Sequence, residues 1–166
     1  MLKFFSRGVA ATAIVAFSSF VSIAQAHDAR AADLVLKHPH SNATVGVTRP
    51  GVVYVTIVNN GKRDDALVSA ESPVAGHVEL HRSLMEGGVM KMRPVKEIVV
   101  PSGGQVALKR GGYHLMLMGL KRPLKAGETY SLILRFRHAG TVTARVRVDP
   151  LRGKAPAMKG MEHHMH

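Results

Sequence analysis

Short segments in which apolar and polar residues alternate, separated by glycine and proline, run through most of this chain. In residues 129–138 (TYSLILRFRH), every second residue from Leu132 to Phe136 is apolar, and residues 141–148 (TVTARVRV) repeat the pattern. Alternation with a period of two is typical of a strand with one buried face, and no long helical stripe of apolar residues is present. Many short strands with Gly and Pro between them predict an all-β fold, a sandwich or small barrel.

Other segments show the same pattern. Residues 77–83 place Val78 and Leu80 on one side of a strand, and His77, Glu79 and His81 on the other. We also expect strands at 52–60, 96–101 and 103–112, and a hairpin turn at Ala139-Gly140 between the last two alternating segments.

The amino end carries the features of an export signal. Basic residues Lys3 and Arg7 precede an apolar run over 8–23, and a small-x-small site follows at 24–26. We expect cleavage after Ala26 and export to the periplasm; a retained membrane anchor is the alternative. This leaves one domain over 27–150 and a short tail over 151–166, long enough for a single core.

The charge of the chain is strongly positive. The formal net charge is +12 with a pI near 10.6, and removal of residues 1–26 lowers the charge to +10. A nucleic-acid partner is not expected, because the chain looks exported and has no basic motif interleaved with aromatic residues. An acidic partner or peripheral contact with an anionic membrane surface fits this charge, and ordinary solubility explains it equally well.

The absence of cysteine narrows the chemistry further. A blue-copper electron-transfer centre needs a Cys thiolate, which this chain lacks. In an oxidising compartment a soft-metal site without thiols is built from Met and His. We do not expect an enzyme: no nucleophile and base can be paired, and Glu79 beside a surface imidazole at His81 is a weak signal for a general base.

Residues 111–124 (GGYHLMLMGLKRPL) show which side chains a metal could meet. His114, Met116 and Met118 share one side of a strand, and neighbours on that side lie about 6.6 Å apart along it. One ion could therefore touch both His114 and Met116. Together with His81 and Met92, the pattern is His-x10-Met-x21-His-x-Met. Two thioethers and two imidazoles favour Cu(I), whereas zinc prefers Cys, His and carboxylate.

Periodicity alone does not select the methionines. Methionine on a strand is usually core packing. Met90 and Met118 share faces with Met92 and Met116, and Met85 is expected in the turn of RSLMEGG.

The motifs resemble the periplasmic copper chaperones of the PCu(A)C family. They are SPVAGHVELH (72–81), GVMKMRPV (88–95), VPSGG (100–104) and GGYHLMLMGLKRPLKAGE (111–128), within a match over about 34–149. The resemblance implies a cupredoxin-like Greek-key β-barrel and a Cu(I) site at His81, Met92, His114 and Met116. It also implies delivery of copper to the dinuclear copper centre of an aa3- or ba3-type cytochrome c oxidase. The acceptor is then the copper subunit of the oxidase, or another copper chaperone. A copper-sequestering protein for metal tolerance is the alternative, since it would use the same ligands.

One position departs from the family. Where its members usually have an aromatic residue after a His-Pro pair, this chain has His40, which either replaces a surface aromatic residue or adds a ligand.

The tail over 153–166 (GKAPAMKGMEHHMH) contains no apolar periodicity, so we expect it to be disordered without metal. Short His-rich tracts are candidates for metal binding. We expect a second copper site there, able to take Cu(II) and, after reduction, to use its thioethers. If that site lies elsewhere, His27, His38 and His40 are the next candidates. The tail residues are Met158, Met161, His163, His164, Met165 and His166.

Overall fold

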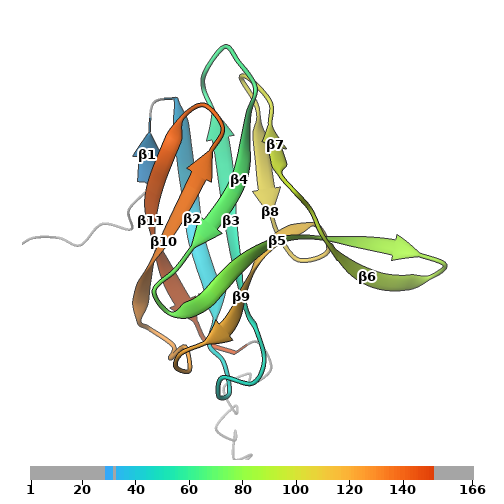
Figure 1. The fold of residues 1–166 in the computed structure, drawn as a ribbon, viewed down its shortest axis with the longest axis vertical. Helices are drawn as coiled ribbons and strands as arrows, with labels where there is room; N and C mark the ends of the chain where they lie inside the picture. Colours follow the sequence, from blue (N-terminus) through green and yellow to red (C-terminus); the bar gives the residue numbers. More distant parts are fainter. Residues whose placement is uncertain (1–28, 32, 152–166) are drawn as a thin grey trace, which may run out of the picture.

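A computed structural model describes residues 29–31 and 33–151 of the chain, and in this part every regular element is a β-strand (Figure 1). No helix in these residues is long and apolar enough to cross a membrane. The expected all-β fold is confirmed. The predicted export signal over 1–26 and residues 152–166 of the tail lie outside the described residues.

Within residues 29–31 and 33–151, eleven strands join into one sheet. Its order is β6-β5-β9-β3-β2-β11-β10-β4-β7, with β1 added to β2 and β8 added to β3. β2 and β11 run parallel, and the other pairs are antiparallel. The strands are β1 (Ala29–Ala31), β2 (Leu34–Asn42), β3 (Gly51–Asn59), β4 (Asp65–Glu71), β5 (Ala75–Glu86), β6 (Val89–Pro94), β7 (Ile98–Val100), β8 (Gln105–Leu108), β9 (Tyr113–Leu120), β10 (Thr129–Phe136) and β11 (Gly140–Asp149).

The inward faces of these strands meet in one hydrophobic core. Successive residues of β10 and β11 alternate between buried and more exposed positions, as the sequence predicts, and Leu132, Leu134 and Val146 are fully buried. Side chains from β2 to β5 and from β7 to β11 pack into the same core. The sheet therefore curls around a single apolar interior, as in a barrel.

Among the strands that the pattern did not predict are β2 and β4. β2 contains Lys37, Pro39 and two histidines, and its pairing with β3 shifts register between Lys37 and His40. β4 begins with three consecutive buried residues, so its period is not two. Both segments are strands because of their neighbours in the sheet, which local pattern does not reveal.

The β5–β6 hairpin projects away from the barrel (Figure 1). Its turn consists of Gly87 and Gly88, which have φ angles of +58° and +78°, between the paired residues Glu86 and Val89. Two residues with positive φ form a type I′ turn, which glycine adopts without strain. The expectation that Met85 lies in a turn is wrong: Met85 belongs to β5 and pairs with Met90.

Asp65 joins β4 to the turn between β10 and β11. Its buried carboxylate accepts backbone N–H groups of Ala66, His138 and Ala139 at 2.7, 3.0 and 2.9 Å. Burial by itself raises the pKa of Asp65, but the three N–H donors outweigh it and hold the pKa below its usual value. The ionised carboxylate of Asp65 thus stabilises the turn between β10 and β11.

Candidate metal centre

His81 and His114 lie side by side on neighbouring strands. They are direct partners in the pairing of β5 with β9, and their ring centroids are 5.9 Å apart. His114 is 4% exposed, and the side chain of His81 is 13% exposed. The expectation of a surface imidazole at His81 is therefore wrong, because most of its side chain is shielded from solvent.

Hydrogen bonds leave one ring nitrogen free on each histidine. Nδ1 of His114 donates to the carbonyl of Gly112 at 3.1 Å, so Nε2 carries the lone pair. Nε2 of His81 donates to Glu79 at 2.8 Å, so Nδ1 carries the lone pair. Within the described part of the chain, His81 Nδ1 and His114 Nε2 are buried without a hydrogen-bond partner. Buried polar atoms normally have partners, and a metal ion would satisfy these two.

Glu79 orients His81, the more exposed of the two paired histidines. Its carboxylate accepts Nε2–H of His81 through one oxygen and Nε2–H of His77, at 3.0 Å, through the other. The hydrogen bonds from His81 and then His77 lower the pKa of Glu79, so it stays ionised. A carboxylate behind an imidazole fixes the ring orientation and makes the opposite nitrogen a better ligand. This is positioning, not the general-base role considered for Glu79.

Met116 and Met92 lie on the same face as the two histidines. Met116 is half-buried on β9, two residues from His114, and pairs with Glu79. Met92 is 60% exposed on β6 and pairs with Ser83, the next residue of β5 on the face of His81. The structure thus brings the four sequence-predicted residues to one face of three adjacent strands.

A hollow of about 250 Å³ lies at this face, between the hairpin and β3. Met92 and His114 line this hollow. The other lining residues, which the sequence pattern did not select as ligands, are Val52, Tyr54, Ser83, Met90, Arg110 and Gly111. Met90 could have been found from the sequence, because it lies two residues from Met92 and therefore shares its face of the strand.

The donor set suits a soft cation. Burial lowers the pKa of His114, which the Gly112 hydrogen bond partly offsets, so its imidazole is neutral and able to bind metal at ordinary pH. Two neutral imidazoles and thioethers are ligands that Cu(I) accepts. In residues 29–151, Ala32 aside, no group of three or more His, Cys, Asp or Glu side chains could hold a metal ion, as a zinc site would need.

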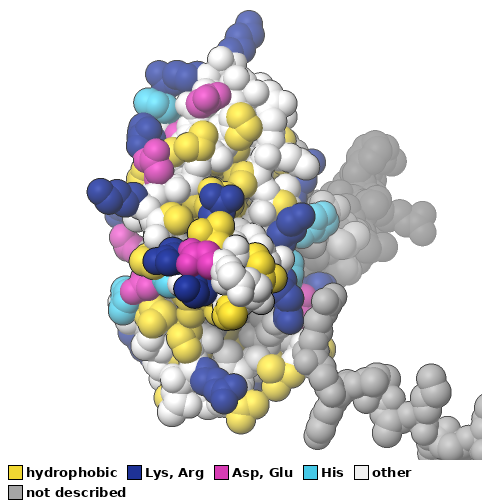
Figure 2. Space-filling view, turned by 90° about the vertical axis from the view of Figure 1, so that its right-hand side faces the viewer, with side chains coloured by type: hydrophobic (Ala, Val, Ile, Leu, Met, Phe, Trp, Pro, Cys, Tyr) yellow, Lys and Arg dark blue, Asp and Glu magenta, His cyan; other side chains and the backbone are white. Residues whose placement is uncertain are grey.

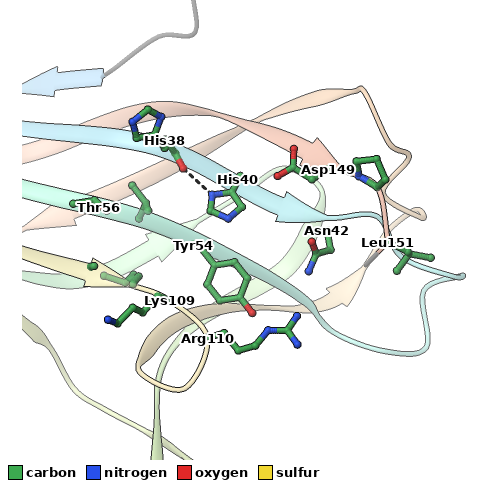
Figure 3. A pocket seen from close by; sticks show the side chains of 13 residues that line it. His38, His40, Asn42, Tyr54, Thr56, Lys109, Arg110, Asp149 and Leu151 are labelled. Atoms are coloured by element: carbon green, nitrogen blue, oxygen red, sulfur yellow. Dashed lines mark hydrogen bonds between the residues drawn. The ribbon is translucent and has the colours of Figure 1, made fainter. Parts of the chain in front are cut away.

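A larger pocket of about 770 Å³ adjoins the centre and shares Tyr54 and Arg110 with it (Figure 3). His40 lies in this pocket, donates from Nδ1 to the carbonyl of His38 at 2.8 Å, and places its ring 5.5 Å from that of Tyr54. His40 therefore packs beside Tyr54, and in the described residues it forms no group with His81 and His114 that could hold a metal ion. His27 lies outside the described residues.

Comparisons with known proteins show which family and which folds this chain resembles. A family model described as "LpqE-like: Putative lipoprotein LpqE-like" matches residues 34–148. A relative named "Putative lipoprotein Lxx21020", from Leifsonia xyli subsp. xyli, is 35% identical over 105 residues, which cover 63% of this chain and 63% of the relative. The chain thus spans less than two thirds of that relative.

Solved structures resemble the fold. The solution structure of apo-DR1885 from Deinococcus radiodurans is 30% identical with a TM-score of 0.56, and the alignment covers 87% of this chain and 97% of that one. The Cu(I) form of DR1885 is 32% identical with a TM-score of 0.53, covering 76% and 83%. The copper-bound PCuAC domain from PmoF2 has a TM-score of 0.65 at 22% identity, covering 75% and 98%, and shows the fold alone.

Proposed function

This chain belongs to the LpqE-like family and has a PCu(A)C domain, and from this premise we propose that it is an exported copper chaperone. One Cu(I) ion binds at His81, Met92, His114 and Met116. The observation that carries the proposal is the pair of buried ring nitrogens without partners, on adjacent strands and on the face that carries Met92 and Met116. The Cu(I)-bound form of DR1885, which is 32% identical, supports the choice of ion.

The site is arranged for release as well as binding. Its four donors are neutral, and Met92 is exposed on a projecting strand while His114 is buried. A partner can therefore displace Met92 first, while the histidines still hold the ion. Stepwise exchange of this kind is what a carrier needs, so the copper is cargo and the protein a binding module, not an enzyme.

We place the acceptor among copper proteins outside the cytoplasm. The resemblance to the PCu(A)C copper chaperones supports the dinuclear copper centre of cytochrome c oxidase as the acceptor, reached directly or through another copper chaperone. Export by a signal cleaved after Ala26, a domain over 27–150, and a second copper site in the tail at His163, His164 and His166 with its methionines complete the proposal.

The test of the site is a double substitution, Met92→Leu with Met116→Leu. Replacing Met by Leu in a packed position usually lowers the free energy of unfolding by less than about 1.5 kcal/mol, so the fold should persist. Met118→Leu makes the same chemical change on the same face of β9 and is the matched control. Competition with a chromophoric Cu(I) chelator should show weaker binding in the double variant alone, and unchanged affinity there would refute the site.

The test of the role is transfer. The Cu(I)-loaded protein is mixed with the apo copper subunit of the oxidase, and the copper content of each protein is measured after separation. A chaperone gives up its ion. Retention of the ion, combined with copper hypersensitivity and normal oxidase activity in cells lacking the gene, would indicate sequestration instead.

A further inference from the structure

The β5–β6 hairpin has two chemically different faces. On one face Glu86 receives two hydrogen bonds from Arg93, both at 2.9 Å, and forms an ion pair with Lys91 at 3.2 Å. Side chains alternate along a strand, so the opposite face carries Met85, Met90 and Met92. In Figure 2, where the hairpin points toward the viewer, charged and hydrophobic side chains lie next to each other at the centre.

The two-residue turn sets Met85 against Met90. Because Glu86 and Val89 close the turn, they form a hydrogen-bonded pair, and the next pair, Met85 and Met90, is of the non-hydrogen-bonded kind. In such pairs the Cα atoms are about 4.5 Å apart and the side chains are closest. Ser83 agrees with this alternation, since its N–H donates at 3.0 Å to the carbonyl of Gly112, the residue before β9, and not across to Met92.

These methionines have no packing role that explains them. Met85, Met90 and Met92 are 64%, 50% and 60% exposed. Among the methionines in the described residues, these three are the exposed ones. A thioether is a soft, neutral ligand suited to Cu(I). Met90 also lines the hollow of the metal centre together with Met92 and His114, so the thioether face is continuous with the histidine pair.

We propose that Met85, Met90 and Met92 form a separate Cu(I) capture site, made of thioethers alone, which takes up the ion at the hairpin and passes it to His81 and His114. The inference rests on the proposed function because it concerns the same ion. The site lies at the part of the domain that reaches farthest from the barrel (Figure 1).

The transfer is a ligand exchange through a shared residue. The Cu–S bonds to Met85 and Met90 break, Cu–N bonds to His81 Nδ1 and His114 Nε2 form, and Met92 stays bound throughout. Met116 then completes the inner set. Both nitrogens carry lone pairs before the ion arrives, so no proton is released, and copper remains Cu(I), so no electron is transferred.

The experiment follows each methionine separately. The full mature chain, labelled with ¹³C at the methionine methyl groups, is titrated with Cu(I) under anaerobic conditions and observed by NMR. We expect the methyl signals of Met92 and Met116 to shift with the first equivalent, and those of Met85 and Met90, which remain as a two-thioether pair once Met92 belongs to the inner site, to shift with further Cu(I). Tail methionines have their own signals, so binding there is distinguished.

A kinetic measurement tests the relay itself. In a Met85→Leu, Met90→Leu variant, loading from a Cu(I)–chelator complex should be about tenfold slower, because the capture site no longer raises the local concentration of the ion. The equilibrium affinity of the inner site should stay within about twofold. Val89→Leu changes an exposed apolar residue of the same hairpin without removing sulfur and should load at the normal rate.

The outcomes separate the two proposals. Unshifted Met85 and Met90 signals, or normal loading in the double variant, would overturn the relay while leaving the inner site intact. If Met85 and Met90 respond but Met92 and Met116 do not, the inner site is wrong and a hairpin site remains without a relay. If none of these four signals responds to Cu(I), both proposals fail.

Discussion

Replacement of Glu79 by glutamine should weaken Cu(I) binding without touching a ligand. Glu79 holds Nε2–H of His81 at 2.8 Å and thereby leaves Nδ1 as the metal-binding atom. A glutamine can instead donate its amide N–H to Nε2, which would move the ring proton to Nδ1 and block the ligand. Even where its oxygen accepts the bond, the negative charge that makes Nδ1 more basic is gone.

The size of the effect follows from exposure. Loss of a carboxylate behind a metal-binding histidine typically costs 10-fold to 100-fold in affinity. The side chain of Glu79 is 39% exposed, so water can replace part of its interaction with His81. We therefore expect a loss at the lower end, about tenfold.

The assay is Cu(I) competition at neutral pH, with Glu86→Gln as the control. Glu86 is a carboxylate of the same strand that pairs with Arg93 and Lys91 on the opposite face of the hairpin. Both variants lose one negative charge, but only Glu79→Gln alters the histidine. Equal affinities of the two variants, with thermal unfolding of the apo forms unchanged, would refute the positioning role.

Three further outcomes test the fold. Asp65→Asn should lower the free energy of unfolding by about 1.5–3 kcal/mol, since the bonds to a charged acceptor are lost. The lowered pKa means that this stabilisation is present above the unfolded value of about 3.9 and is lost as pH falls through the folded pKa, so chemical denaturation of the variant should depend less on pH in that acidic range. Leu117→Ala, at a fully buried position, should cost about 2–5 kcal/mol by the same denaturation measurement. Gly88→Val places a β-branched residue at φ +78°; hydrogen exchange in β6 should become faster while the barrel stays protected, and equal exchange would show that the turn does not hold the hairpin.

Which face each side chain occupies was predictable from the sequence for several strands. The period-two pattern placed Leu80 inside and His81 on the other face, and it placed His114 and Met116 together. Geometry requires this, because successive side chains of any strand point in opposite directions. The chemistry of the donors was equally local: a chain without cysteine that gathers thioethers and imidazoles favours a soft ion.

Tertiary structure alone decided which of these residues meet. The pairing of His81 with His114 depends on the register between β5 and β9, which are far apart along the chain. Met85 was expected in a turn, but it lies in β5 opposite Met90, because the geometry of the Gly87-Gly88 turn sets the register of the hairpin. The contact of Glu79 with His81, and thus the choice of Nδ1 as the free nitrogen, exists only once both side chains have taken their rotamers. Local pattern fixes the face of a strand, whereas neighbours across strands follow from long-range packing and backbone pairing, which no single segment encodes.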